Sequence, residues 1–120
     1  MLFRKKRTAP EPKPVAVFTV PHSKGFRGYK RIKLATYKDE IAQEGLGKIS
    51  AADSISRISL SVYELKDAPP FVRVEADGNR VGTMWNDSWK EYIDLIRAGR
   101  CSSAHLNVSD GNAYLFVKFD

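Results

Sequence analysis

The chain has 120 residues, 42% of them hydrophobic and 28% charged, with a formal net charge of +6. This length and composition fit a single globular domain and exclude a disordered chain. Every apolar run is much shorter than the roughly 20 residues of a membrane-spanning helix, so no membrane span is expected.

The positive charge is concentrated at the start of the chain. Residues 1–38 contain 11 Lys and Arg but a single acid, Glu11, whereas residues 39–120 contain 9 Lys and Arg and 13 Asp and Glu. The first segment therefore carries +10 and the second −4. Such asymmetry is typical of a basic arm or face that meets a polyanion, joined to a neutral or acidic body.

Residues 1–14 predict a basic, proline-rich, disordered tail. Prolines at positions 10, 12 and 14 disfavour a helix and favour an extended chain. They stand where a secretion signal would need an apolar segment, and the lone thiol of Cys101 suits a reducing compartment, so we expect a cytoplasmic protein. The tail would attract phosphates or anionic lipid headgroups unspecifically, or serve solubility alone. Its cations are Arg4, Lys5, Lys6 and Arg7.

Residues 22–38 are the main candidate binding segment. Cations are interleaved with aromatic residues here, as in grooves for single-stranded nucleic acid, where cations follow the backbone and aromatic rings stack on bases. Gly25 and Gly28 would let this segment approach a ligand closely. The alternative is a basic surface loop whose aromatic rings pack onto the core. The residues that we expect to contact nucleic acid are Lys24, Phe26, Arg27, Tyr29, Lys30, Arg31 and Lys33.

The first half of the domain predicts short strands and one weak helix. Residues 15–20 predict one short strand, and residues 29–37 contain a second predicted strand. Residues 38–46 predict a short helix, which we expect to end at Gly45 and Gly47.

The middle of the chain predicts three strands. From residue 55 to residue 65 apolar side chains alternate with polar ones, which predicts a strand with one buried face. Residues 71–76 and 79–85 flank Asp77-Gly78, which is one of the strongest signals for a two-residue hairpin.

An amphipathic helix is predicted over about residues 88–98. Apolar residues at positions 89, 92, 93 and 96 share one face at helical spacing. Ser88 and Glu91 predict a capping box at the start, and Gly99 stands where a C′ glycine belongs.

Residues 104–108 and 113–119 predict a last hairpin, which brings the total to about six or seven short strands. Short, numerous strands with one capped helix predict an α+β fold. We expect residues 15–120 to form a small, curled, mostly antiparallel β-barrel of the OB or SH3 type, with the helix closing one end.

Residues 67–99 (DAPPFVRVEADGNRVGTMWNDSWKEYIDLIRAG) resemble the core of the HIRAN domain family. The family pattern has a strand, a turn with a small or charged pair, an apolar-Gly-apolar step, and a helix that ends in an apolar pair and glycine. The matching positions are Val72, Val74, Asp77-Gly78, Val81-Gly82, Met84, Leu95-Ile96 and Gly99.

The resemblance implies a small β-barrel that binds DNA, including single-stranded 3′ ends, as an accessory module. In the family, the loop before the strand supplies an acid and an aromatic residue to the DNA end. In this chain Asp67 and Phe71 take those positions, so both join the predicted nucleic-acid site.

Catalytic chemistry is not expected. His22 and His105 have no metal-ligand pattern around them, and Ser102-Ser103 lack the sharp turn that presents a nucleophilic serine. We therefore predict no enzyme activity, metal or cofactor. The leading prediction is a non-catalytic module for single-stranded DNA or DNA ends. The alternative is a protein-interaction adaptor that docks a partner at an edge of the barrel or near Trp85.

Overall fold

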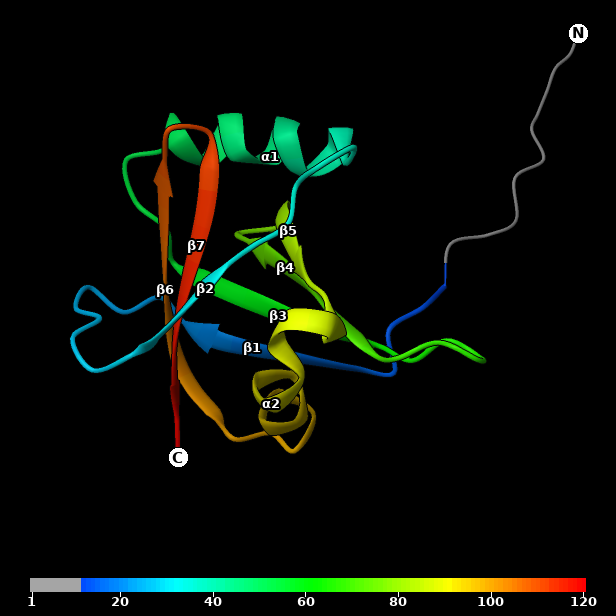
Figure 1. The fold of residues 1–120 in the computed structure, drawn as a ribbon. Coiled ribbons are helices and arrows are strands. Elements are labelled where there is room, and N and C mark those ends of the chain that lie inside the picture. Colours follow the sequence, from blue (N-terminus) through cyan, green and yellow to red (C-terminus); the bar gives the residue numbers. More distant parts are fainter. Residues whose placement is uncertain (1–11) are drawn as a thin grey trace, which may run out of the picture.

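The computed structural model describes residues 12–120, so the predicted tail cations at positions 4–7 lie outside the described residues. The described chain forms seven strands and two helices (Figure 1). In chain order these are β1 (Ala16–Pro21), β2 (Lys30–Lys33), α1 (Glu40–Ser50), β3 (Arg57–Tyr63), β4 (Phe71–Ala76), β5 (Asn79–Met84), α2 (Asn86–Arg97), β6 (Cys101–Ser109) and β7 (Asn112–Phe119).

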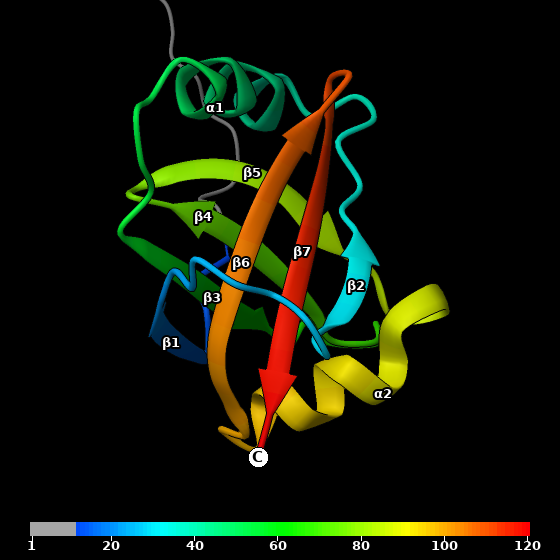
Figure 2. The same ribbon diagram turned by 90° about the vertical axis from the view of Figure 1, so that its left-hand side faces the viewer.

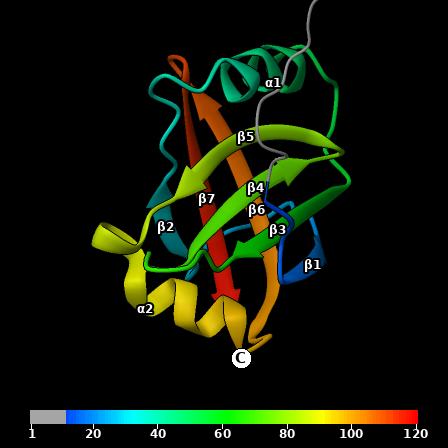
Figure 3. The same cartoon turned by 90° about the vertical axis from the view of Figure 1, so that its right-hand side faces the viewer.

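The strands form two antiparallel sheets. One has the order β1-β3-β4-β5 and the other has the order β2-β7-β6. Figures 2 and 3 view the molecule from opposite sides, with the three-stranded sheet in front in Figure 2 and the four-stranded sheet in front in Figure 3. The predicted α+β class is confirmed, and so are the predicted short antiparallel strands.

The predicted barrel is confirmed only in part, because the strands do not form one closed sheet. Isolated bridges join the edges of the two sheets: His22 pairs with Ala104, and Ala35 pairs with Thr83. Each of these two bridges joins the sheets at a single residue pair, because the chain turns away immediately after His22 and after Ala35.

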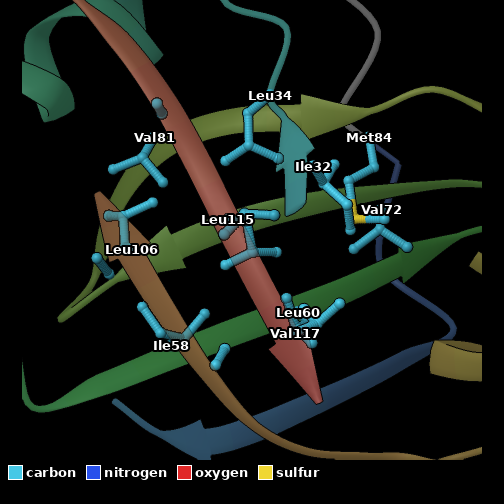
Figure 4. Packing of buried hydrophobic residues seen from close by; sticks show 14 of the residues in the cluster. Ile32, Leu34, Ile58, Leu60, Val72, Val81, Met84, Leu106, Leu115 and Val117 are labelled. Carbon is cyan, nitrogen blue, oxygen red and sulfur yellow. The ribbon is translucent and has the colours of Figure 1, made fainter. Parts of the chain in front are cut away.

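The core lies between the two sheets (Figure 4). As predicted, alternate residues of β3 are buried, and Ile58 and Leu60 are fully buried. The opposite face of β3 is more covered than predicted. Tyr63 is only 8% exposed, because it stacks on Phe71 in the neighbouring strand and lies beneath the guanidinium of Arg73.

Helix α1 is longer than predicted, and the prediction that glycine ends it is wrong. Asp39 caps the helix by accepting a hydrogen bond from the Ala42 N–H at 3.0 Å. The helix continues through both glycines to Ser50. Gly45 packs on β5, where a Cβ atom would collide with the carbonyl oxygen of Arg80. This glycine allows close helix–strand packing and does not terminate the helix.

The start of α2 also differs from the prediction. The residue before the helix is Trp85, and no side chain caps this end among the described residues. Ser88 lies inside the first turn, so the predicted capping box is wrong. Trp89 has non-helical backbone angles (φ −128°, ψ 28°) and divides the short first turn from the rest of the helix. The apolar face is confirmed, since Ile93 and Ile96 are fully buried.

The end of α2 agrees with the prediction. Gly99 has a positive φ of 73° and donates its N–H to the Ile96 carbonyl at 2.9 Å. Arg100 donates its N–H to the Leu95 carbonyl at 3.0 Å. These two bonds form a Schellman motif, which satisfies carbonyls left free in the last turn.

Both predicted hairpins are present. Asp77 and Gly78 have φ values of 48° and 86°, as a type I′ turn requires. Asp110 and Gly111 join β6 to β7 with φ values of 52° and 77°. The strand predicted within residues 29–37 is present as β2, which pairs with β7.

Candidate nucleic-acid interface

The outer face of the three-stranded sheet combines cations with aromatic rings. In the pairing register, Arg31 of β2 lies opposite Phe116 of β7, which lies opposite His105 of β6. The residues between them, such as Ile32 and Leu115, are fully buried in the core. The next row of the outer face consists of Lys33, Tyr114 and Asn107.

The loop of residues 22–29 crosses this outer face (Figure 2). Phe26 stacks on His105 and packs on Phe116, with ring centroids 4.5 Å apart in both pairs. The Tyr29 hydroxyl forms a 2.6 Å hydrogen bond with the Ser103 hydroxyl. We call this loop and the outer face of β2, β6 and β7 the basic-aromatic face.

The electrostatic character of the basic-aromatic face is positive. Arg31 lies over the ring of Tyr114, with its guanidinium carbon 4.4 Å from the ring centre. Strands β2, β6 and β7 contain no Asp or Glu. Cations without acids between them produce a local positive potential that attracts a polyanion. The exposed cations of this face are Lys24, Arg27, Arg31, Lys33 and Lys118.

Two histidines stack on each other where the loop begins, His22 in the loop and His105 on β6. The ring of His22 stacks on His105 with a centroid distance of 4.7 Å, so His105 is packed against both His22 and Phe26. Nδ1 of His105 is 2.7 Å from the Ser23 carbonyl oxygen. Burial, and secondarily the neighbouring His105, lower the pKa of His22 below its ordinary value.

The structure assembles most of the predicted segment but separates Lys30 from its neighbours. Arg31 and Lys33 lie on the outer face of the sheet, whereas Lys30 shares the strand face of buried Ile32. Lys30 lines a groove beside α2 together with Tyr92 and Phe119. The two-residue side-chain period of a strand causes this separation.

Asp67 lies in the connection between β3 and β4, and Phe71 is the first residue of β4. This connection lies on the opposite side of the molecule from the 22–29 loop (Figure 1). Asp67 is exposed, and its φ is +62°. Phe71 is 6% exposed and stacks on Tyr63 at 5.0 Å. The structure therefore does not bring these two predicted residues together with the basic segment.

A shallow apolar hollow of about 310 Å³ lies on this second side. Phe71 contributes to it, as does Trp85, which is 47% exposed. Trp85 packs on Phe71 with a centroid distance of 4.9 Å. The remaining lining residues are Leu65, Ala68, Pro69, Asn86 and Asp87.

Sequence reasoning missed the contribution of the last hairpin to the basic-aromatic face. Residues 112–119 alternate strictly, so their spacing alone would have placed Tyr114, Phe116 and Lys118 on one side of a strand. The missing information was the partner strand. Nothing local to β7 indicates that β2, about 80 residues earlier in the chain, pairs with it.

Within residues 12–120 there is no group of three or more His, Cys, Asp or Glu side chains placed to hold a metal ion. Burial raises the pKa of the Cys101 thiol to about 11, so this thiol is protonated at neutral pH. Neither α1 nor α2, the helices of this part of the chain, has the length and apolar character needed to cross a membrane.

Comparison with protein-family models, with curated proteins and with solved structures found no match for this chain.

Proposed function

We propose that this protein is a non-catalytic module that binds single-stranded nucleic acid through the basic-aromatic face. The observation that carries the proposal is the composition of that face. Exposed cations surround a cluster of half-exposed aromatic rings, and the three strands beneath contain no acid. Phosphates would contact the cations, while Phe26, Tyr114 and Phe116 offer ring surface on which bases stack.

The resemblance of residues 67–99 to the HIRAN family supports the same class of ligand. The bridges between the sheet edges support interpreting the fold as an opened OB- or SH3-like barrel. We accordingly propose a cytoplasmic HIRAN-like module in which Asp67 and Phe71 serve a DNA end separately from the basic-aromatic face. Lys30, on the α2 side of β2, would contribute only to the general positive potential.

The test is the salt dependence of binding to a single-stranded oligonucleotide, measured by fluorescence anisotropy. Contacts from five cations would give a slope of log affinity against log salt of about −3 to −4. Replacing Arg31, Lys33 and Lys118 with Gln should make this slope shallower by about 2. A flat salt response of the intact protein would refute the proposal.

A matched control removes the same charge from another part of the surface. Lys48, Lys66 and Lys90 are exposed and lie outside the basic-aromatic face. Their replacement with Gln lowers the net charge equally, so it should leave the salt slope nearly unchanged. Equal weakening by both triple variants would indicate attraction by net charge without a defined face.

The second candidate function is a protein-interaction adaptor, favoured by the exposed Trp85 in its apolar hollow. Large aromatic residues in shallow hollows are common anchors of protein interfaces. This alternative expects partner binding that survives the triple Gln change at Arg31, Lys33 and Lys118 but is lost when Trp85 is replaced with Ala. Competition by nucleic acid would argue against it.

A further inference from the structure

His105 lies on β6, at one edge of the three-stranded sheet, and is held on three sides. His22 stacks on the ring at 4.7 Å and Phe26 stacks on it at 4.5 Å. Nδ1 lies 2.7 Å from the Ser23 carbonyl oxygen. These contacts fix the position of the imidazole in the row that contains Arg31 and Phe116.

The hydrogen bond to Ser23 determines where His105 gains a proton. A carbonyl oxygen only accepts, so Nδ1 must carry the hydrogen and donate it. Nε2, which has no hydrogen-bond partner among residues 12–120, is therefore the nitrogen that remains to be protonated. Histidine is the side chain whose charge ordinarily changes between about pH 5 and pH 8.

His22 is the less favourable place for a proton. Its Nε2 atom is buried without a partner in the described part of the chain, so a charge there would be poorly solvated. Two stacked imidazoles 4.7 Å apart also disfavour protonation of both rings at once.

The groups around the pair make this proton sensitive to a ligand. Arg31 in the same row and Lys118 on β7 are cations, as is Lys24 on the loop. Asp77 favours a positive charge on His22 and is the acid that acts on this side of the pair. A bound phosphate would neutralise part of the cationic field and would itself attract the protonated ring.

We propose that binding of a phosphate backbone to the basic-aromatic face places a proton on Nε2 of His105, which makes His105 a pH-dependent ligand contact. This inference rests on the proposed function, because it names one further residue of the same face. Ligand binding and proton uptake are then linked. If one proton is taken up on binding, the affinity for the ligand rises by up to about tenfold for each unit that the pH falls.

The experiment measures the affinity for a rhodamine-labelled single-stranded oligonucleotide of about 15 nucleotides at constant salt, between about pH 7.5 and about pH 5.5. The key variant is His105→Asn. The amide of asparagine can still donate to the Ser23 carbonyl, but it has no nitrogen that titrates in this range. Circular dichroism at both pH values verifies that each protein remains folded.

We expect the affinity of the intact protein to rise about fivefold or more on acidification, and that of His105→Asn to stay nearly constant. His22→Asn is the matched control and should retain the rise, because it leaves Nε2 of His105 in place. A rise that persists in His105→Asn but vanishes in His22→Asn would overturn the assignment.

Two further results are decisive. Binding of the intact protein with the same affinity at both pH values would overturn this inference and leave the proposed function standing. Failure to bind at either pH would overturn both.

Discussion

Two glycines in one helix illustrate how differently the same residue type can act. Gly45 faces β5, and a Cβ atom there would meet the carbonyl oxygen of Arg80. Gly47, half a turn further along, has open space around its Cα. The first glycine is required by packing, whereas the second only adds conformational entropy to the unfolded chain.

Replacement of these glycines with alanine should therefore have opposite effects. We expect Gly45→Ala to lower the free energy of unfolding by about 1–3 kcal/mol, because helix α1 must move away from β5. Gly47→Ala should raise it by about 0.5–1 kcal/mol, since alanine favours the helix. Urea unfolding followed by circular dichroism measures both. Equal effects of the two changes would contradict the packing that we describe.

Asp77 makes stability depend on acid pH. Its carboxylate accepts the N–H of Ser56 at 3.0 Å and that of Arg57 at 2.9 Å. These backbone hydrogen bonds, first that of Ser56 and then that of Arg57, lower the pKa of Asp77. A carboxyl group whose pKa is lowered by folding stabilises the folded state at pH values above about 3.9, which is its pKa in the unfolded chain. This stabilisation is lost as the pH falls through the lower pKa of the folded state.

Asp77→Asn tests this contribution, since asparagine also suits a type I′ turn. We expect the intact protein to be more stable than the variant near neutral pH. The difference in free energy of unfolding should shrink as the pH falls below about 4. Denaturant titrations across the acid range measure it. A difference that stays constant with pH would argue against a role for the ionised carboxylate.

At the scale of elements, the two helices begin in different ways. The Asp39 carboxylate caps α1 and is also 3.3 Å from the guanidinium of Arg80 on β5. The start of α2 follows Trp85 without a side-chain cap in the described residues. Both the local capping sequence and tertiary contacts influence the residue at which a helix begins. Trp85 packs on Phe71 at the point where the chain passes from β5 to α2.

We expect Asp39→Ala to lower the free energy of unfolding by about 1–2 kcal/mol, because the cap and its ion pair are both lost. Ser88→Ala should change it by less than about 0.5 kcal/mol, because this serine lies inside the first turn. Thermal and urea unfolding of the two variants can be compared directly. A large loss in Ser88→Ala would restore the capping box predicted from the sequence.

In the whole molecule, basic residues that are far apart in the sequence lie on the same sheet. The 22–29 loop and β2 come from the basic first third, whereas Lys118 comes from the last strand. The hollow at Trp85 is lined by the β3–β4 connection, the first residue of β4 and the start of α2. The β3–β4 connection lies on the other side of the molecule from the 22–29 loop (Figure 1). The fold therefore presents two chemically different surfaces on opposite sides.

Deletion of residues 1–11 separates unspecific attraction from binding at the basic-aromatic face. The deletion removes four cations and one acid. We expect weaker affinity for all nucleic acids and a shallower salt slope, because fewer phosphates are neutralised. The preference for single strands over duplex should persist, since it depends on aromatic rings in the described domain. Anisotropy with both ligands measures this, and loss of the preference would place recognition in the deleted segment.

Features that depend on neighbours along the chain could be predicted from the residues alone. The alternation in β3, the two Asp-Gly turns and the glycine that ends α2 are all local signals, and they predicted those elements correctly. Local signals failed where distant contacts prevail. Gly45 lies inside a helix, where its missing side chain lets the backbone of Arg80 approach. Ser88 lies inside the first turn of a helix that begins directly after Trp85.

Only the tertiary structure decided which residues form the candidate site. The sequence located the cations and aromatic rings of residues 22–33, but the pairing of β2 with β7 added Tyr114, Phe116 and Lys118. The same register turned Lys30 to the other side. Asp67 and Phe71 lie apart from this face, since they belong to the β3–β4 connection and to β4 of the other sheet. The physical reason is that strand pairing joins residues far apart in sequence, and a shift of one residue exchanges the two faces of a strand.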